Sequence, residues 1–396
     1  MPWKVTSVLD EKVMFIAECL RDDTPMTVLC ERYGISRETG YVWRRRYAAQ
    51  GAAGLAERSR APLRHGSSTS AALVVRIIEA RKRKPYWGPK KLLATLAAAD
   101  PAVTWPSAST VSEILRREGL SEPRRRRRRA LTVDQPFAET AAANDTWCID
   151  FKGWIRTGDG VRCDPLTVTD AYSRYLLSLE IVSPDTEGVE PVMDRLFREH
   201  GLPRAIRSDN GPPFASTGAG GLSRLSVRWA KMGIRLERIY PGNPQQNGRH
   251  ERMHGTLKPQ TCDPPAATAA DQQGRFDAFR QEYNDDRPHE ALGQRPPKQF
   301  YAASPRQYPA RIEEPSYGPD EEVRRVRSSG EIKWRGAMCF ITEALIGESV
   351  GIREREDGHW IVRFADIPVV LIDRHTGKVA RFGAGRPPRT KTTSTN

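Results

Sequence analysis

Six consecutive arginines divide this chain of 396 residues into two unlike parts. They occupy positions 124–129, directly after Pro123, and a block of like charges of this length repels itself and is extended in isolation. Charge is distributed around the same point, because residues 1–134 hold 26 Lys and Arg against 14 Asp and Glu, whereas residues 135–396 hold 37 against 35. We therefore expect a basic linker over residues 122–139 and a polyanionic partner for the N-terminal third. The alternative is a basic surface that serves solubility.

The residues before this linker predict two small helical domains, over residues 1–60 and 61–121. In the first, Gly34 and Ile35 form a turn, and Ser36 is a good N-cap for the helix that follows. A short helix, a turn and a basic helix are typical of a helix-turn-helix. The predicted DNA contacts of the basic helix are Arg37, Trp43, Arg44, Arg45 and Arg46. The alternative is a three-helix packing module that exposes these arginines to water.

The second helical domain repeats this pattern. Leu92, Leu93 and Leu96 share one helix face, and Ser107 can cap a third helix, so we expect a second helix-turn-helix. Beside two such domains, the arginine tract is expected to lie along DNA phosphates, which give affinity without reading sequence. A flexible linker is the alternative. The tract consists of Arg124, Arg125, Arg126, Arg127, Arg128 and Arg129.

The pattern changes after residue 140. Short β-rich runs alternate with helical stretches over residues 140–303, which predicts a mixed α/β domain. Residues 304–320 hold several Pro and Gly and suit a linker, and the strand-like runs of residues 321–382 predict a small β-barrel. Residues 383–396 are polar and are expected to be disordered. No stretch is apolar over the roughly 18 residues that a membrane helix needs, so we expect a cytoplasmic protein without a membrane partner.

Three carboxylates stand out by their context. Asp150 lies inside an apolar strand, where a charge is costly unless a metal ion, an ion pair or a hydrogen bond compensates it. Asp209 follows the strand-like residues 205–208, and strand ends are where α/β folds place their sites, although Asp also favours turns. Glu251 belongs to a helix expected to begin near Asn247. Lys258 lies two helical turns further on, on the same face; the alternative is an ordinary charged helix face.

These segments resemble the integrase-like catalytic core of bacterial insertion-sequence transposases, which is related to retroviral integrases. The resemblance spans most of residues 140–303 and rests on four motifs in the right order. The motifs are the strand with Asp150, the turn Asp209-Asn210-Gly211, the segment Asn247-Gly248-Arg249-His250-Glu251-Arg252 with Lys258, and Tyr283-Asn284-Asp285-Asp286-Arg287-Pro288-His289. The helical head and the β-rich tail also look like the flanking domains of this family.

The resemblance implies an RNase H-like fold with a mixed five-stranded sheet and helices on both faces. It assigns the catalytic triad and the metal ligands to Asp150, Asp209 and Glu251, and the residue that positions DNA to Lys258. The implied cofactors are two Mg²⁺ or Mn²⁺ ions, since hard cations prefer carboxylate oxygens and a pair of ions can serve both the attacking and the leaving oxygen. The implied activity is cleavage of DNA followed by strand transfer.

The resemblance also implies the partners. They are double-stranded DNA, as the terminal inverted repeats of the element and as the target, and at least one further copy of the chain, because the element ends must be paired. The expected location is therefore the cytoplasm, in association with the bacterial nucleoid.

The chain departs from the family pattern in two places. The gap between Asp209 and Glu251 holds 41 residues, longer than the pattern, and we interpret residues 215–228, rich in Gly and Ser, as an inserted surface loop. The zinc-binding head of retroviral integrases is replaced by the helix-turn-helix units. Neither departure removes a carboxylate of the predicted triad.

Three other functions remain as alternatives. His250-Glu251-Arg252-Met253-His254 matches the HExxH signature of zinc proteases, but Pro244 and Gly248 interrupt the helix that this signature needs. A DNA-binding regulator with an inactive core and a nuclease without strand transfer are the other two. Asp170 is a candidate fourth acidic ligand, for which a local hydrogen-bonding role is the simpler interpretation.

Overall fold

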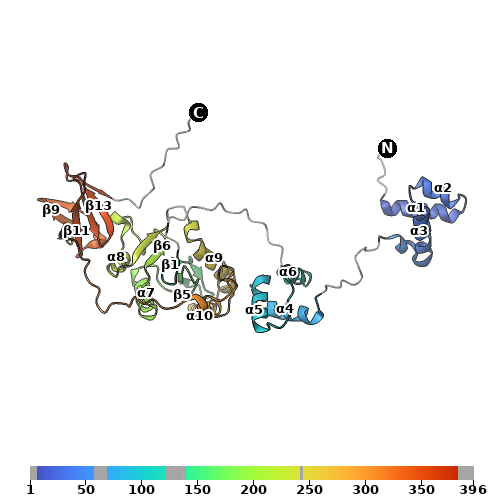
Figure 1. Ribbon diagram of the computed structural model, residues 1–396, viewed down its shortest axis with the longest axis horizontal. Helices are drawn as coiled ribbons and strands as arrows, with labels where there is room; N and C mark the ends of the chain where they lie inside the picture. Colours follow the sequence, from blue (N-terminus) through green and yellow to red (C-terminus); the bar gives the residue numbers. More distant parts are fainter. Residues whose placement is uncertain (1–6, 58–68, 122–136, 138–139, 241–243, 382–396) are drawn as a thin grey trace, which may run out of the picture. The chain divides into compact units, whose positions relative to one another are not determined.

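The structure is a computed structural model, and it describes residues 7–57, 69–121, 137, 140–240 and 244–381. The arginine tract 124–129 and the predicted disordered tail 383–396 lie outside the described residues, as does nearly all of the predicted linker. The chain separates into two compact units, Met1–Ser70 and Ala71–Asn396, and each is described by itself (Figure 1). Within the described segments, no helix is long and apolar enough to cross a membrane.

The first unit is a three-helix domain. Its elements are α1 (Val8–Arg21), α2 (Met26–Arg32), α3 (Arg37–Gln50) and the short 3₁₀ helix η1 (Gly51–Leu55). The hydroxyl of Ser36 caps α3 by accepting a hydrogen bond from the Thr39 N–H, as the sequence predicts. A Cβ on Gly40 would lie 2.6 Å from Sγ of Cys30, so this glycine lets α3 approach α2 closely. The helices enclose Phe15, Ile16, Cys19, Leu29, Cys30 and Leu55.

The second unit begins with another three-helix group. Its helices are α4 (Ala71–Arg83), α5 (Pro89–Ala99) and α6 (Ala108–Arg117). Ser107 caps α6 through the Thr110 N–H, again as predicted. The buried side chains come from one face of each helix and include Ile77, Trp87, Leu92, Leu96, Val111, Ile114 and Leu115. Leu92 and Leu96, which were expected to share one helix face, are both in this core.

A five-stranded mixed sheet is the centre of the second unit. Its strands are β1 (Thr146–Phe151), β4 (Pro165–Asp170), β5 (Leu176–Ile181), β6 (Ala205–Ser208) and β7 (Arg235–Arg238). The order is β5-β4-β1-β6-β7, with β5, β4 and β1 antiparallel to one another and β6 and β7 parallel to β1. A small hairpin of β2 (Ile155–Arg156) and β3 (Arg162–Cys163) precedes β4. This is the mixed five-stranded sheet that the RNase H-like expectation requires.

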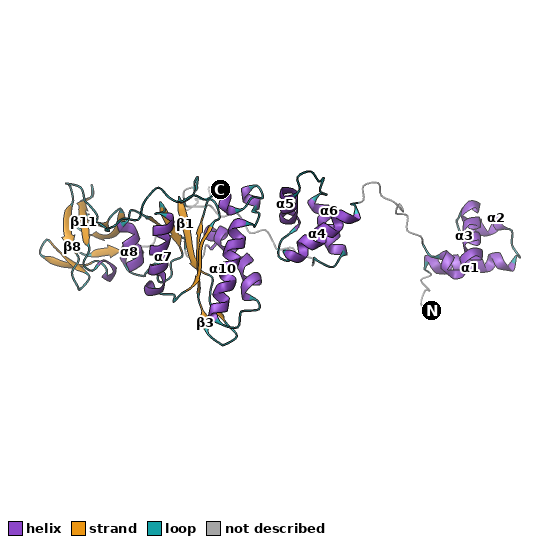
Figure 2. Ribbon diagram, turned by 90° about the horizontal axis from the view of Figure 1, so that it is seen from below, coloured by secondary structure: helices purple, strands orange, loops and turns teal. Residues whose placement is uncertain are grey.

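Helices cover both faces of this sheet. One face carries α7 (Thr186–His200) and α8 (Arg224–Lys231), and the other carries α9 (Gly248–Leu257) and α10 (Ala269–Asp285), as Figure 2 shows for α7, α8 and α10. Side chains alternate along a strand. On β1, Trp147 and Ile149 accordingly join the apolar core with α7 and α8, whereas Asp150 lies on the α9 side beside His254.

The expected surface loop over residues 215–228 is wrong. This region contains the 3₁₀ helix η2 (Ala219–Gly221) and most of α8, and Leu225 and Trp229 are buried in the central core. Ser223 and Ser226 form a capping box at the start of α8, so the serines that suggested a loop begin a helix instead.

The C-terminal region forms an antiparallel sheet. The five-stranded sheet has the order β14-β13-β12-β11-β8, and β9 and β10 form a separate hairpin. These strands are β8 (Glu322–Arg325), β9 (Glu331–Trp334), β10 (Ala337–Phe340), β11 (Ser349–Glu354), β12 (Trp360–Phe364), β13 (Ile367–Ile372) and β14 (Val379–Arg381). The predicted strands are therefore present. Closure into a barrel is not observed among the described residues, because β8 and β14 remain the two edges of the sheet.

This sheet packs against the central domain. Its core includes Val227 and Ala230 of α8, and Lys231 forms a 2.8 Å ion pair with Glu348. The predicted linker 304–320 has no helix or strand, but it runs along the central domain, where Tyr308 stacks on Phe197. The predicted domain boundaries themselves stay predictions.

Candidate active site

Two of the three predicted carboxylates meet because of the register between β1 and β6. These strands are parallel, and Cys148 pairs with Arg207. Asp150 and Asp209 each lie two residues further along, so Asp150 near the end of β1 is level with Asp209, which directly follows β6. Neighbouring strands lie about 4.8 Å apart. The loop after Asp209 is held to the end of β1, because the ring of Phe214 stacks on Phe151 with centroids 5.8 Å apart.

The third predicted carboxylate, Glu251, comes from the first turn of α9 and is exposed. Helix α9 begins at Gly248, which confirms the start expected near Asn247. Glu251 and Lys258 line one open hollow of about 350 Å³, together with His254 and with Lys152 from the segment after β1. The spacing of seven residues thus places the predicted carboxylate and lysine on the same side of the helix.

The electrostatics of Asp150 link the three carboxylates. Burial first, then the negative charge of Asp209 and, more weakly, that of Glu251 together raise the pKa of Asp150 to about 7. A carboxyl group with this pKa is only partly ionised at neutral pH. Bringing a cation into the cluster would remove this repulsion and favour the ionised form.

Two buried histidines hold α9 against the sheet. The Thr167 hydroxyl donates to the Asp150 carbonyl at 2.9 Å and lies 2.7 and 2.8 Å from Nε2 of His250 and His254. A hydroxyl has one proton, so both imidazoles donate to it from Nε2. The Thr169 hydroxyl forms a 2.8 Å hydrogen bond with Nδ1 of His250. Burial lowers the pKa of His250 to about 3 and that of His254 to about 2, so both rings are neutral.

This network leaves one lone pair free. Nδ1 of His254 lies 4.0 Å from Oδ2 of Asp150, and its other nitrogen is the donor to Thr167. Ligand atoms of Asp150, His250 and His254 lie within 4.8 Å of one another, a grouping that could hold a metal ion. Both ring nitrogens of His250 are already hydrogen-bonded, which leaves the carboxylate and His254 as the available donors.

Sequence reasoning missed this role of the histidine pair. The signal was present as two histidines four residues apart, but it was considered only as a zinc-protease signature. The threonines that form hydrogen bonds with His250 could not be identified from the sequence, because they lie on a strand more than 80 residues away. A protease zinc site needs nitrogens that this network uses to pack the helix.

Asp170 has the local role expected for it. It is 1% exposed, and its carboxylate accepts hydrogen bonds from the Asn144 N–H at 2.7 Å and from the N–H and hydroxyl of Ser173 at 2.7 and 2.6 Å. These donors satisfy both oxygens in the turn between β4 and β5.

The predicted DNA-contacting side chains of α3 divide into two groups. Arg37, Arg44 and Arg45 are exposed. Trp43 packs on the core of its domain with Lys12 3.9 Å and Arg46 4.6 Å from its ring centroid, and Arg46 also donates to a backbone carbonyl. The structure therefore gives Trp43 and Arg46 packing roles, and their contacts to DNA stay predictions with those of the exposed arginines.

Family models match nearly the whole described chain. Two Integrase core domain models match residues 140–244 and 232–297, and the model of the IS481 family transposase, C-terminal domain, matches residues 321–380. A Helix-turn-helix domain matches residues 14–62, and a Homeodomain-like domain matches residues 39–115.

Two curated relatives come from bacterial insertion elements. The insertion element IS407 uncharacterized 31.7 kDa protein of Burkholderia multivorans is 30% identical over 236 residues, which are 58% of this chain and 80% of that protein. The insertion element IS476 uncharacterized 39.2 kDa protein of Xanthomonas euvesicatoria is 29% identical over 255 residues, 63% of this chain and 70% of that protein.

Two solved structures to which the chain is similar are of retroviral proteins. The HTLV-2 integrase catalytic core domain in complex with magnesium is 15% identical, covers 41% of this chain and 100% of its own, and has a TM-score of 0.33. The simian T-cell lymphotropic virus intasome in complex with a PP2A regulatory subunit is 14% identical, covers 74% and 98%, and has a TM-score of 0.36.

The integrase core and its helix-turn-helix head define a polynucleotidyl transferase of the Asp-Asp-Glu class, whose members use divalent metal ions. The chain belongs to the integrase-core transposases of bacterial insertion elements.

Proposed function

We propose that this transposase binds the ends of its insertion element, cleaves the DNA there and joins the freed 3′ end to target DNA. Asp150, Asp209 and Glu251 are the proposed catalytic carboxylates, and Lys258 is the proposed contact to DNA. The observation that carries the proposal is the register of β1 and β6, because it brings Asp150, near the end of β1, level with Asp209, which directly follows β6.

The donor set fits divalent cations such as Mg²⁺ or Mn²⁺. Burial raises the pKa of Asp150 most, the negative charges of Asp209 and, more weakly, Glu251 add to this rise, and Nδ1 of His254 lies 4.0 Å from the same carboxylate. Carboxylate oxygens are the ligands that these ions prefer. A pair of ions bound there supplies Lewis-acid stabilisation of the attacking and leaving oxygens. Two ions per site is part of the proposal.

The remaining side chains of the hollow would act on the DNA. Lys152 and Lys258 present ammonium groups to the space beside Glu251, where they can neutralise phosphate oxygens. His250 and His254 hold α9 against the sheet and thereby fix the position of Glu251. Both imidazoles are neutral and add no charge to the site. The proposed binding partners are double-stranded element ends and target DNA, and pairing of two ends requires at least a dimer on DNA.

A cleavage and joining assay tests the proposal. Labelled duplex from the element's own end is incubated with Mg²⁺ or Mn²⁺ and with wild type, Glu251→Gln or Glu187→Gln. Glu187 is the matched control, because it is an exposed glutamate in the first turn of α7, on the opposite face of the sheet. We expect cut and joined products with wild type and Glu187→Gln, and none with Glu251→Gln or with chelator.

The other outcomes separate the alternatives. Cutting without joining would indicate a nuclease, and DNA binding by wild type without any cutting would indicate a regulator. Cutting that survives in Glu251→Gln would show that the third carboxylate is a different residue.

A further inference from the structure

A second cavity lies on the other flank of α9, away from the proposed triad. We call it the arginine pocket. Its volume is about 260 Å³, and its positive side chains are Lys91 of α5, Arg174 of the turn after β4, Arg249 and Arg252 of α9, and Arg287 of the segment after α10. Glu290 is the one carboxylate in its lining. Arg249 and Arg252 are three residues apart and share a helix side, whereas Glu251 and Lys258 line the hollow on the other side.

The positive charges of the arginine pocket are not compensated within the described part of the chain. None of its four arginines forms an ion pair with another described residue. Arg287 is only 7% exposed, yet its Nη1 has no hydrogen-bond partner there, and Nε2 of His289 beside it is likewise unpartnered. A buried cation without a partner is costly, so a fold retains one where a ligand completes it.

The nearby carboxylates are already paired with other residues. Glu290 forms a 2.6 Å ion pair with Lys90. Glu282 forms a 3.0 Å ion pair with Lys84 and accepts a hydrogen bond from the indole of Trp87 at 3.1 Å. Glu282 also raises the pKa of Arg287 through its charge, but burial of the guanidinium lowers that pKa by more.

The titration of the pocket residues follows from this excess of positive charge. Burial first, then the positive charges of Arg249 and Arg252, lower the pKa of Arg174 to about 10. Burial and then Arg287 lower the pKa of Lys91 to about 8. Each cation therefore raises the free energy of the others, and an anion in the pocket would relieve all of them.

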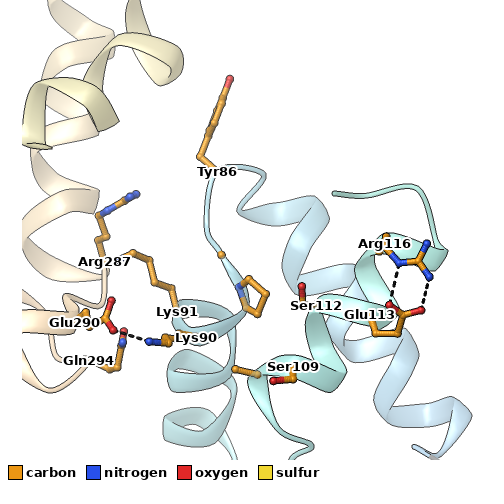
Figure 3. Close-up of a pocket in the computed structure, with 13 residues that line it drawn as sticks. Tyr86, Lys90, Lys91, Ser109, Ser112, Glu113, Arg116, Arg287, Glu290 and Gln294 are labelled. Atoms are coloured by element: carbon orange, nitrogen blue, oxygen red, sulfur yellow. Dashed lines mark hydrogen bonds and ion pairs between the residues drawn. The ribbon is translucent and has the colours of Figure 1, made fainter. Parts of the chain in front are cut away.

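A larger cavity continues the basic surface toward the second helix-turn-helix. It has a volume of about 670 Å³ and lies between α5 and α6 on one side and residues 287–294 on the other, as Figure 3 shows. It shares Lys91, Arg287 and Glu290 with the arginine pocket and adds Arg116 of α6, whose charge is paired with Glu113 in the same lining. The two cavities thus form one path from α6 to the flank of α9.

We propose that the arginine pocket binds a backbone phosphate of the DNA that α6 holds, and thereby guides that strand toward the hollow on the other flank of α9. Guanidinium groups suit this role, because their planar donors bind phosphate oxygens in pairs. The inference rests on the proposed function only in naming DNA as the polyanion.

Salt-dependent DNA binding tests the pocket. The full chain is titrated with a duplex carrying the element's end, in chelator, over a range of salt concentrations, and separately with a random duplex. Arg249→Gln and Arg252→Gln are suitable variants, since both side chains are exposed and the fold does not depend on their burial. Arg287→Gln is the buried counterpart. Arg198→Gln is the matched control, because Arg198 is an exposed arginine of α7 on the opposite face of the sheet.

We expect each pocket variant to reduce the slope of log K against log salt by about 0.9 and to weaken binding to both duplexes alike, as the loss of one phosphate contact does. Arg198→Gln keeps the wild-type slope, and thermal unfolding confirms that each variant is folded. Unchanged slopes for Arg249→Gln and Arg252→Gln would overturn the proposal. A second result would also overturn it. Inorganic phosphate would stabilise wild type against thermal unfolding but not these variants, while the salt slopes of the variants for DNA stay unchanged.

The result is independent of catalysis. Because binding is measured without divalent ions, a transposase that fails to cut still reports on the pocket. Conversely, loss of cutting in Glu251→Gln together with a wild-type binding slope supports the triad whatever the arginine variants do.

Discussion

The two faces of the central sheet are built for different purposes. The face under α7 and α8 is packed almost entirely with apolar side chains, and its charged residues are paired at the rim, as Arg228 is with Asp194 at 2.7 Å. The face under α9 and α10 buries Thr167, His250 and His254 and leaves the arginine pocket uncompensated. The contrast indicates that one face supplies stability, and the other gives up part of it to hold polar groups for chemistry and DNA.

Helix α10 shows how polar groups can still stabilise that second face. The side-chain amide of Asn284 accepts from the Leu176 N–H at 2.8 Å and donates to the Leu176 carbonyl at 3.0 Å, and Gln273 donates to the Leu179 carbonyl. These bonds occupy backbone groups along β5, which is an edge strand. They also protect that edge from pairing with another chain.

The largest expected effect is on the apolar face. Phe197 of α7 is 1% exposed and stacks on Trp147 with centroids 5.8 Å apart. Phe197→Ala should lower the free energy of unfolding by about 3–5 kcal/mol, through lost burial and the cavity left behind. Urea denaturation followed by tryptophan fluorescence measures it. A loss below about 1 kcal/mol would mean that this face is not the stabilising one.

On the polar face, Thr167→Val should cost less stability and more activity. It removes the hydroxyl that both histidines share and leaves two buried imidazole nitrogens unpartnered, at a cost of about 1–3 kcal/mol. Because α9 then loses its fixed position, the metal concentration for half-maximal cleavage should rise about 10–100-fold, as when outer partners of metal ligands are removed.

Thr157→Val is the control for that prediction. Thr157 is 4% exposed, and its hydroxyl donates at 2.6 Å to Asp159 in the β2–β3 hairpin. It should lose stability without a change in metal dependence. If Thr167→Val and Thr157→Val show the same metal dependence of cleavage, the Thr167 network does not position α9 for metal binding.

Acid should destabilise the polar face through His289. Burial first, then the positive charges of Lys91 and Arg287, lower the pKa of His289 to about 3. Between pH 6.5 and 3 the unfolded chain binds this proton and the folded chain does not, so stability falls as the pH falls, by at most about 1.4 kcal/mol per unit. His289→Phe keeps a ring against Tyr283, 4.7 Å away in wild type, and should show a shallower loss in acid denaturation. An unchanged pH profile would contradict this.

The smallest expected effect on stability belongs to the arginine pocket. Arg252→Gln removes one of several repelling charges from an exposed position, so the free energy of unfolding should stay within about 0.5 kcal/mol of wild type or rise. Differential scanning calorimetry of the DNA-free protein measures this. A clear loss of stability would mean that Arg252 has a structural role, and the contrast between the faces would be weaker.

Local patterns predicted much of the fold. Ser36 and Ser107 identified the helices that they cap, and period-two alternation identified the C-terminal strands. Prediction from the sequence failed where tertiary packing decides which face of a helix is buried. Val13 and Leu20 lie at helical spacing with the buried Ile16 in the sequence, but they are 46% and 62% exposed, because Phe15 and Cys19 join the core instead.

The candidate site, like the fold, was predictable where local sequence patterns define it and not where tertiary packing does. Asp150 and Asp209 each follow from a strand and its end, but the register that makes them level is a tertiary property. The arginine pocket was not predictable, because its members come from α5, a turn, α9 and the segment after α10, and no local pattern brings these together. The motif of residues 283–289 contributed to the family resemblance, but nothing in its sequence predicted that Arg287 is buried without an ion-pair partner among the described residues.

Binding of Mn²⁺ to the full chain tests the central claim most directly. Electron paramagnetic resonance of wild type, Glu251→Gln and Glu187→Gln, without DNA, counts the bound ions and their affinity. If Asp150, Asp209 and Glu251 hold the metal, Glu251→Gln should weaken binding or lower the number of ions, while Glu187→Gln matches wild type. Equal binding by Glu251→Gln and wild type would contradict the account, and would direct attention to Asp150 and His254 as the site of the ion.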